Sequence, residues 1–143
     1  MGCNGGWITK SFEFLIHNGA QSRSSYPYLD RLDVCNMNPS AVVARVAEVY
    51  GIADAKIVIK DGPIGVYVHA LGDFASYGGG IFDGHCANQY DHALSAVGFG
   101  NEGGVEYWII RNSWGPEWGE GGYIRVKDRG NCHLTFDSTP RVE

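Results

Sequence analysis

The sequence lacks the positive charge of nucleic-acid-binding proteins, the long apolar segment of membrane-spanning proteins and the signal peptide of secreted proteins. Its 143 residues carry 11 Lys and Arg against 16 Asp and Glu, a net charge of −5, which leaves no footprint for nucleic acid or an anionic membrane. No apolar run approaches the ~20 residues of a membrane-spanning helix. After Met1 there is neither the basic segment nor the apolar segment of a secretory signal peptide.

The cysteines do not form a metal-binding pattern. There are four, Cys3, Cys35, Cys86 and Cys132, without a CxxC pair or a histidine spaced as in a zinc finger, so we expect no metal and no cofactor. An even number of widely spaced cysteines favours two disulfides and an oxidising compartment. Because such chemistry conflicts with the missing signal peptide, we expect the natural N-terminus to be absent from this sequence.

The composition favours a folded, loop-rich chain. Hydrophobic residues make up 44% and charged residues 19%, which suits one domain of ordinary size or most of a larger one. Glycine accounts for 21 residues, about twice the usual share of ~7%, and many aromatic residues stand beside the glycines. This combination indicates turns around a concave site.

Hydrophobic spacing predicts an α+β chain, with helix and loops first and antiparallel strands later. A helix is expected over 8–18, ended by Asn18-Gly19, and a short one over 53–60. Residues 41–50 fit both the helical and the strand period, so either structure remains open there. Short strands separated by glycine turns are expected over 64–69, 93–99, 106–111 and 123–127.

Three segments carry the chemical signal, and their order is more specific than any one of them. They are Gly2-Cys3-Asn4-Gly5-Gly6, Asp91-His92-Ala93, and Asn112-Ser113-Trp114-Gly115 with Trp118-Gly119 close behind. On these residues the chain resembles the papain-like cysteine peptidases. The resemblance covers nearly the whole chain and includes Tyr26-Pro27-Tyr28, Gly62-Pro63-Ile64 and Gly79-Gly80-Ile81-Phe82.

The resemblance implies proteolysis by a Cys-His-Asn arrangement, with His92 as the catalytic imidazole and Asn112 as the residue that orients it. Trp114 would cover the His–Asn hydrogen bond, and Trp118 would help to wall the primed side of the cleft. A thiol with a pKa near 8.5 is mostly protonated at neutral pH, and a neighbouring imidazolium lowers that pKa.

The nucleophile motif of the family, Cys-Gly-Ser-Cys-Trp or similar, does not occur in this sequence. The family places its His and Asn about 130 and 150 residues after the nucleophile, which puts the missing Cys roughly 40 residues before Met1. We therefore expect the chain alone to be inactive, with an upstream segment or chain as a partner. The alternative is a non-catalytic relative that binds peptides or proteins.

The resemblance also implies roles for the cysteines. Cys86 and Cys132 would pair with each other, whereas Cys3 and Cys35 match family cysteines whose partners lie upstream. The alternative is that Cys3 and Cys35 pair with one another. Family and disulfides together imply a lysosomal or secreted protein.

The expected substrates are peptides or proteins, and cystatin-like inhibitors are possible partners by the same resemblance; nucleic acid and membranes are not expected. Glycines 5 and 6 would pair with an extended substrate. Asp137, five residues after Cys132, would form the floor of the pocket for the second side chain before the scissile bond. Cathepsin B has an acidic residue at the matching place, so we expect Arg to be tolerated there. The pocket walls would come from Trp7, Ile8, Tyr67, Tyr90 and Ala93, with a secondary role for Asp91.

The expected fold is the papain-like cysteine proteinase fold in part, of α+β class. Residues 1–45 would be the end of the helical domain, and residues 46–143 the β-barrel-like domain that carries the catalytic His and Asn. No insertion of the cathepsin B type precedes His92, which favours endopeptidase action. The helix that bears the nucleophile is absent from the sequence, so we expect an exposed apolar patch where it would pack.

Overall fold

The computed structural model describes residues 2–87 and 89–143, and the chain forms two compact units. One unit comprises Met1–Tyr50 together with Pro140–Glu143, and the other comprises Gly51–Thr139. Residues 46–50 and 140–143, which the sequence predicts to lie in the second domain, thus belong to the first unit. In the described part of the chain, no helix has the length and apolar character needed to cross a membrane.

The first unit is built from one helix and short strands. The expected helix is confirmed as α1, and of residues 41–50, for which the sequence leaves helix and strand both open, all but Ala41 and Arg45 lie in strands β2 and β3. α1 ends at Gly19, whose φ of 77° suits glycine and whose N–H donates to the Leu15 carbonyl. None of the residues of α1 is buried. The elements are η1 (Gly2–Asn4), α1 (Ile8–Asn18), β1 (Ala20–Gln21), η2 (Pro39–Ala41), β2 (Val42–Ala44) and β3 (Val46–Gly51).

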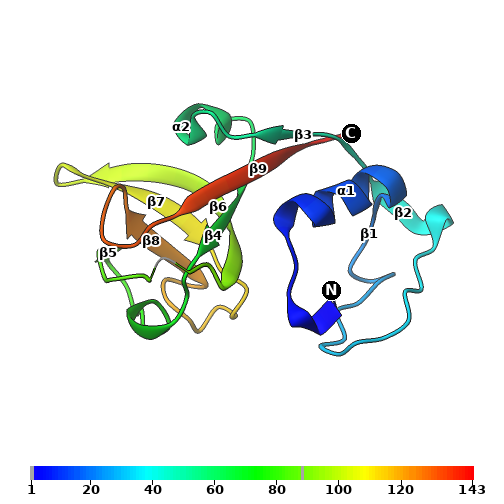
Figure 1. Ribbon diagram of the computed structural model, residues 1–143, viewed down its shortest axis with the longest axis horizontal. Helices are drawn as coiled ribbons and strands as arrows, with labels where there is room; N and C mark the ends of the chain where they lie inside the picture. The colour runs from blue at the N-terminus through cyan, green and yellow to red at the C-terminus, as the bar shows by residue number, and fades with distance from the viewer. Residues whose placement is uncertain (1, 88) are drawn as a thin grey trace. The chain divides into compact units, whose positions relative to one another are not determined.

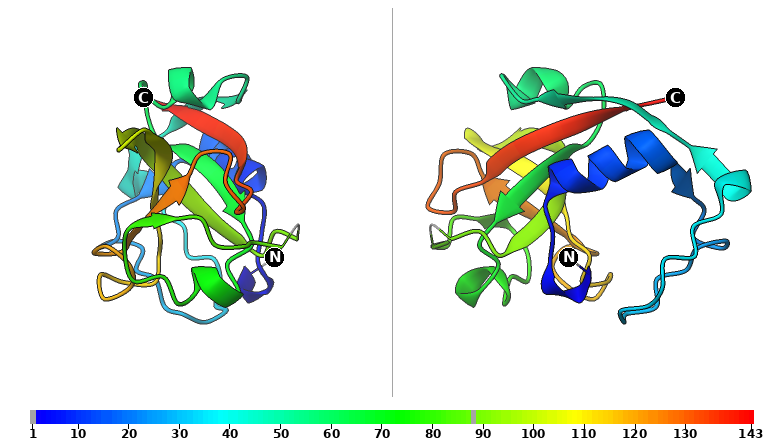
Figure 2. Two further views of the ribbon diagram at one scale, coloured as in Figure 1. Left: turned by 90° about the vertical axis from the view of Figure 1, so that its left-hand side faces the viewer. Right: turned by 45° about the vertical axis from the view of Figure 1, so that its right-hand side comes forward.

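The second unit is dominated by an antiparallel sheet. The strand order is β3-β9-β4-β6-β7-β8-β5, with β5 parallel to β8, and Figures 1 and 2 show β4, β6, β7 and β8 side by side. Of the residues of β9, 135–139 belong to this unit and 140–142 to the first. The elements are α2 (Ala55–Val58), β4 (Ile64–Val68), η3 (Gly72–Phe74), β5 (Ile81–Phe82), β6 (His92–Glu102), β7 (Val105–Arg111), β8 (Tyr123–Lys127) and β9 (Thr135–Val142).

The strands of the second unit that bury apolar side chains in its core are the ones that the sequence predicts. Strand β4 buries Ile64, Val66 and Val68 completely, every second residue, as expected for a strand with one face on a core. The four predicted strands are confirmed. Strands β5 and β9 are not predicted, because β5 has two residues and β9 has a polar sequence that includes Pro140. Helix α2 is shorter than predicted, since it starts only after its cap, Asp54.

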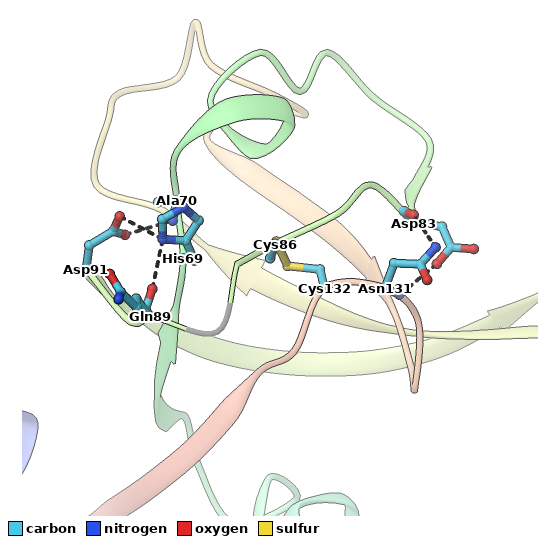
Figure 3. Close-up of a disulfide and its surroundings, with 8 residues drawn as sticks. All are labelled: His69, Ala70, Asp83, Cys86, Gln89, Asp91, Asn131 and Cys132. Atoms are coloured by element: carbon cyan, nitrogen blue, oxygen red, sulfur yellow. Dashed lines mark hydrogen bonds and ion pairs between the residues drawn. A yellow bond between two sulfur atoms is a disulfide. The ribbon is translucent and has the colours of Figure 1, made fainter.

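A disulfide joins Cys86 to Cys132, as the resemblance implies, and it lies inside the second unit (Figure 3). The two residues are 46 positions apart, and the bond closes a loop that contains β6, β7 and β8. Both cysteines are buried. The bond therefore restricts the unfolded chain over the part that carries His92 and Asn112.

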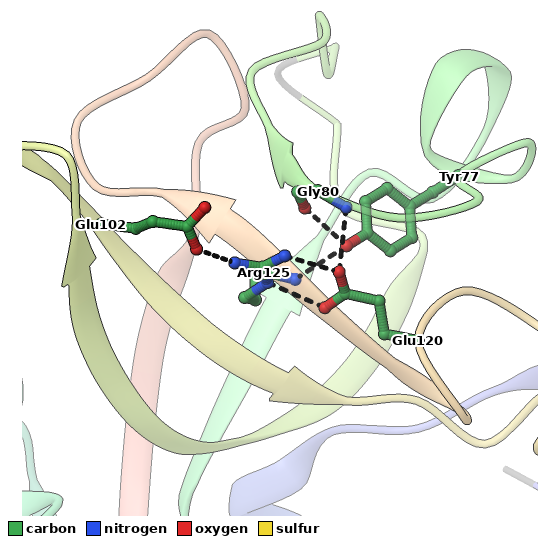
Figure 4. A network of polar contacts seen from close by, with 5 residues as sticks. All are labelled: Tyr77, Gly80, Glu102, Glu120 and Arg125. Atoms are coloured by element: carbon green, nitrogen blue, oxygen red, sulfur yellow. Dashed lines mark hydrogen bonds and ion pairs between the residues drawn. The ribbon is translucent and has the colours of Figure 1, made fainter.

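Arg125 of β8 forms ion pairs with Glu102 and Glu120 (Figure 4). Its guanidinium donates to both carboxylate oxygens of Glu120 at 2.9 and 2.8 Å and to Glu102 at 2.6 Å. Glu120 also accepts from the N–H of Gly80 at 2.9 Å. The hydrogen bonds from Arg125 lower the pKa of Glu120 to about 2, against the opposing effect of partial burial. The network fixes the loop that contains Trp118.

Loss of the Glu120 charge is expected to destabilise the second unit. Glu120→Gln should lower the free energy of unfolding by about 1.5–3 kcal/mol at pH 7, the usual range for hydrogen bonds to charged groups. The folded-state pKa of about 2 lies below the ordinary 4.5, so this stabilisation is present above about pH 4.5 and is lost as the pH falls toward 2. Denaturant unfolding at several pH values measures it.

The matched control for that variant is Glu117→Gln, since Glu117 is exposed in the same loop. This control should change stability by less than about 0.5 kcal/mol. A destabilisation by Glu120→Gln that stays constant from pH 7 to pH 2.5 would contradict the assignment.

The disulfide should contribute strongly to stability. Replacing both Cys86 and Cys132 by Ala should lower the free energy of unfolding by about 2–5 kcal/mol, measured by chemical denaturation without reductant. The control is the pair Cys3→Ser and Cys35→Ser, whose thiols are free and exposed. Thiol titration of the native chain should find two reactive groups before reduction and four afterwards; four from the outset would show that the bond does not form.

Candidate active site

His92 and Asn112 meet at the end of the sheet. His92 opens β6, Asn112 follows β7, and His92 Nε2 lies 3.0 Å from Asn112 Oδ1. The same Oδ1 accepts the backbone N–H of Ser113 at 2.7 Å. A backbone N–H can only donate, so the Asn112 atom that faces it is the oxygen. His92 Nε2 therefore carries the hydrogen, and Nδ1 keeps the lone pair that can accept a proton.

Asn112 is held firmly by its own backbone and by burial. Its N–H donates to the Gly122 carbonyl at 2.9 Å, and the residue is only 8% exposed. Its Nδ2 is buried and meets no acceptor among the described residues, an arrangement that costs roughly 1–3 kcal/mol. The oxygen is therefore the end of this side chain that makes its hydrogen bonds, to His92 and to the Ser113 N–H.

Aromatic side chains cover the imidazole. Trp114 stacks on His92 with ring centroids 5.1 Å apart and an interplanar angle of 20°. Trp118 meets Trp114 edge-on at 5.2 Å and donates its Nε1–H to the Ala75 carbonyl at 3.0 Å. Phe74, completely buried, stacks on Trp118 at 5.4 Å and supports both rings. An apolar cover of this kind strengthens the hydrogen bond beneath it.

The turn that carries Trp118 requires glycine. Gly119 has a φ of 57°, and a Cβ there would lie 2.5 Å from the Tyr123 carbonyl oxygen. A side chain at this position would force the turn open. The glycines around Trp118 thus allow the loop to fold back onto β8.

Several of the expected pocket residues of the second unit lie together. Tyr67 is paired with Ala93 across β4 and β6 and with Thr135 across β4 and β9. The rings of Tyr67 and Tyr90 are 6.4 Å apart, and the hydroxyl of Tyr90 lies 2.5 Å from that of Thr135. Tyr67 is 9% exposed and Tyr90 48% exposed, so Tyr90 forms the outer edge of this cluster.

Asp137 lies two residues beyond Thr135 in β9 and is half-buried. One of its carboxylate oxygens accepts the Ser138 hydroxyl at 2.7 Å, and no hydrogen bond to the other oxygen is found among the described residues. Asp91 differs from this, because its two oxygens already contact the Ala70 N–H and the His69 ring. Both carboxylate oxygens of Asp91 are thus occupied by contacts within this chain.

The remaining expected binding residues belong to the first unit. Ile8 opens α1, and an open hollow beside it is lined by Gly5, Gly6, Trp7, Lys10, Ser11, Phe14 and Leu15. A Cβ added at Gly5 or Gly6 would meet no described atom within 4 Å, so their backbone groups are accessible. Trp7 is 59% and Phe14 46% exposed. An apolar surface is therefore present along this segment.

The thiols divide into two kinds. Cys86 and Cys132 are oxidised to each other, whereas Cys3 and Cys35 are free and exposed. The alternative in which Cys3 bonds to Cys35 is thus not the arrangement found. Within residues 2–87 and 89–143, no three His, Cys, Asp or Glu side chains gather as around a metal ion.

Two sets of contacts near the candidate site could not be predicted from the sequence. His69 lacks a motif and reads as a surface or turn residue, yet its side chain is only 19% exposed and contacts Asp91. Phe74 and Ala75 support Trp118 from a segment more than 40 positions earlier. Nothing local in the sequence signals these contacts, since both partners are needed to recognise them.

Comparison with known proteins identifies the relatives of the chain. The family described as papain family cysteine protease matches residues 1–140. Fruit bromelain of Ananas comosus is 38% identical over 132 residues, which cover 87% of this chain and 38% of that protein. Papaya proteinase 4 of Carica papaya is 40% identical over 133 residues, which cover 88% of this chain and 38% of that protein.

The solved structures agree with the sequence relatives. The structure of the bromelain protease from Ananas comosus in complex with the E64 inhibitor has a TM-score of 0.91 and 35% identity, over 100% of this chain and 73% of that one. A Carica candamarcensis cysteine protease gives a TM-score of 0.85 at 34% identity, over 96% of this chain and 69% of that one. The chain thus spans about two fifths of the first two curated relatives and has the papain-like fold in part. It belongs to the papain family of cysteine proteases.

Proposed function

We propose that this chain is the C-terminal portion of a cysteine endopeptidase in which His92 is the general base and acid and Asn112 orients its ring. The observation that carries the proposal is the hydrogen bond from His92 Nε2–H to Asn112 Oδ1 at 3.0 Å. Since the neighbouring Ser113 N–H fixes the amide orientation, the Nδ1 atom of His92 is left to accept the proton of a thiol.

The reaction then follows from that protonation state. Nδ1 of His92 takes the proton of a cysteine thiol, and the thiolate attacks a peptide carbonyl to form a tetrahedral intermediate. As the intermediate collapses, the C–N bond breaks and His92 returns the proton to the leaving amine. Water, deprotonated by His92, hydrolyses the thioester and releases the second product and the thiol.

The thiol must come from outside this sequence. Cys86 and Cys132 are bonded to each other, and by resemblance Cys3 and Cys35 would pair with upstream cysteines in the complete protein. Exposed apolar side chains support an upstream segment as the partner, because Trp7, directly before α1, and Phe14, within it, would be buried by a packed helix. We therefore expect no turnover by this chain alone.

The proposed substrates are peptides or proteins held in extended form. Gly5 and Gly6 have accessible backbone groups for such a strand. Tyr67, Tyr90 and Ala93 would border the pocket for the second side chain before the scissile bond, and Trp7 and Ile8 are proposed as further substrate contacts. The side chain of Tyr67 is largely buried, and Asp137 would supply negative charge to this pocket.

The disulfide and the family favour action in a lysosomal or extracellular compartment, where disulfides persist. Cystatin-like inhibitors remain expected partners on the same basis. A second candidate function is peptide or protein binding without catalysis. It is favoured by the sequence itself, which contains no nucleophile motif.

Labelling of the protein from its natural source tests the proposal. After treatment with a thiol-reactive peptidyl epoxide, intact masses are measured before and after reduction. We expect the label on a cysteine upstream of Met1, either in one longer chain or in a partner chain released by reduction. Peptidase activity of the purified 143-residue chain, blocked by a thiol reagent, would contradict the expected inactivity, and an unlabelled protein of this length would favour the binding function.

Variants of the complete peptidase separate catalysis from folding. His92→Ala should reduce kcat by a factor of at least about 10³, because the thiol loses its base. His133→Ala, which alters an exposed histidine of the same unit, should leave kcat within about twofold. Equal activities of the two variants would remove His92 from the mechanism.

The charge of Asp137 should affect specificity. In the complete peptidase, Asp137→Ala should lower the ratio of kcat/KM for Arg over Phe at the second position before the scissile bond by about tenfold, because a basic side chain loses its counter-charge. Asp137→Asn should have a similar effect, and Asp73→Ala, exposed in the same unit, should have none. An unchanged ratio in Asp137→Ala would show that Asp137 does not face this pocket.

A further inference from the structure

The two residues that follow β4, His69 and Ala70, contact the segment that precedes His92 (Figure 3). Nδ1 of His69 lies 2.8 Å from the Gln89 carbonyl oxygen and 3.1 Å from Asp91 Oδ2. The adjacent Ala70 N–H donates to Asp91 Oδ1 at 2.8 Å. These contacts, which we call the His69 clamp, join residues 69–70 to residues 89–91.

The protonation of His69 Nδ1 follows from its neighbours. A carbonyl oxygen and a carboxylate oxygen are both acceptors, so the atom that faces them must carry a hydrogen. His69 therefore has its hydrogen on Nδ1, whereas His92 has one on Nε2. The two histidines use opposite ring nitrogens, as each is bound by its own acceptor.

The clamp immobilises Asp91 through both its side chain and its backbone. The two carboxylate oxygens are engaged by His69 and Ala70, and the Asp91 N–H donates to the Val68 carbonyl at 3.2 Å. Among the described residues, Asp91 is the charged group within ion-pair distance of His69. Because Asp91 directly precedes His92, its fixed position restricts the backbone from which the His92 side chain extends.

We propose that His69 is a positioning residue for the reaction, and that its Nδ1–H holds Gln89 and Asp91 so that the His92 ring is presented to the nucleophile. This rests on the proposed function of His92. Asn112 fixes the ring at Nε2, and the His69 clamp fixes the chain on the other side of the same residue. A small displacement of His92 would increase the distance between its Nδ1 and the thiol. Proton transfer between the two groups is sensitive to that distance.

Three variants separate the Nδ1 donor from mere polarity at this site. His69→Asn places an amide nitrogen close to the position of Nδ1, His69→Gln places one close to that of Nε2, and His69→Ala has no donor. His85→Ala changes an exposed histidine of the same unit and is the control. The Asn and Gln variants are similar perturbations of folding, so their comparison decides the question even if His69→Ala is unstable.

The 143-residue chain itself provides the first readout. By ¹⁵N NMR, we expect a hydrogen on Nδ1 of His69 and on Nε2 of His92. Amide exchange at Asp91 and Ala70 should accelerate at least about tenfold in His69→Ala and His69→Gln, and should stay within about twofold in His69→Asn and His85→Ala. Equal exchange in the Asn and Gln variants, or a hydrogen on Nε2 alone in His69, would overturn the clamp.

The complete peptidase gives the second readout. kcat should fall on the order of tenfold to a hundredfold in His69→Ala and His69→Gln with KM little changed, and should recover in His69→Asn. An unchanged kcat in all three variants would overturn the positioning role. If the wild-type peptidase proved inactive, the proposed function would fail, while the exchange measurements on the chain would still decide whether the clamp exists.

Discussion

The hydrogen bond between His92 and Asn112 requires one particular register of the sheet. The two residues are 20 positions apart, and their side chains meet only because β6 and β7 pair in a defined register, with Ser95 opposite Arg111. A slip of one residue would turn one side chain to the other face of the sheet. The buried alternation in β4, β6 and β7 prevents this slip, since it would expose Ile110 or Leu94. The hydrophobic core therefore specifies the imidazole–amide pair.

Once the register is set, neighbouring segments hold the pair from several sides. The Gly122 carbonyl binds the backbone of Asn112, and Arg125 and Glu120 hold the loop in which Gly122 lies. Trp114 covers the ring of His92. These supports come from loops, whose positions depend on ion pairs and aromatic packing more than on backbone ladders. Such contacts are sensitive to charge and to side-chain shape, so the loops are the part of the site that single substitutions can disturb most selectively.

The sequence predicts the parts of this site that depend on local pattern. The helix at residues 8–18 and the buried strands follow from the spacing of apolar side chains, and the motifs at His92 and Asn112 are confirmed as spatial neighbours. The contacts made by His69 and Glu120 could not be predicted, because each joins segments whose meeting depends on the whole sheet. Strand β9 is missed for a related reason: its polar residues are stabilised by pairing with β4 and not by an apolar alternation of their own.

The two units differ in how far they can stabilise themselves. The second unit has a continuous core and an internal disulfide. In the first, α1 has 11 residues and buries none of them, and isolated helices below about 12–15 residues are marginal in water. Its apolar residues therefore contribute little unless another segment covers them. Because His92 and Asn112 both belong to the unit with the continuous core, the hydrogen bond between them is held by contacts within that unit.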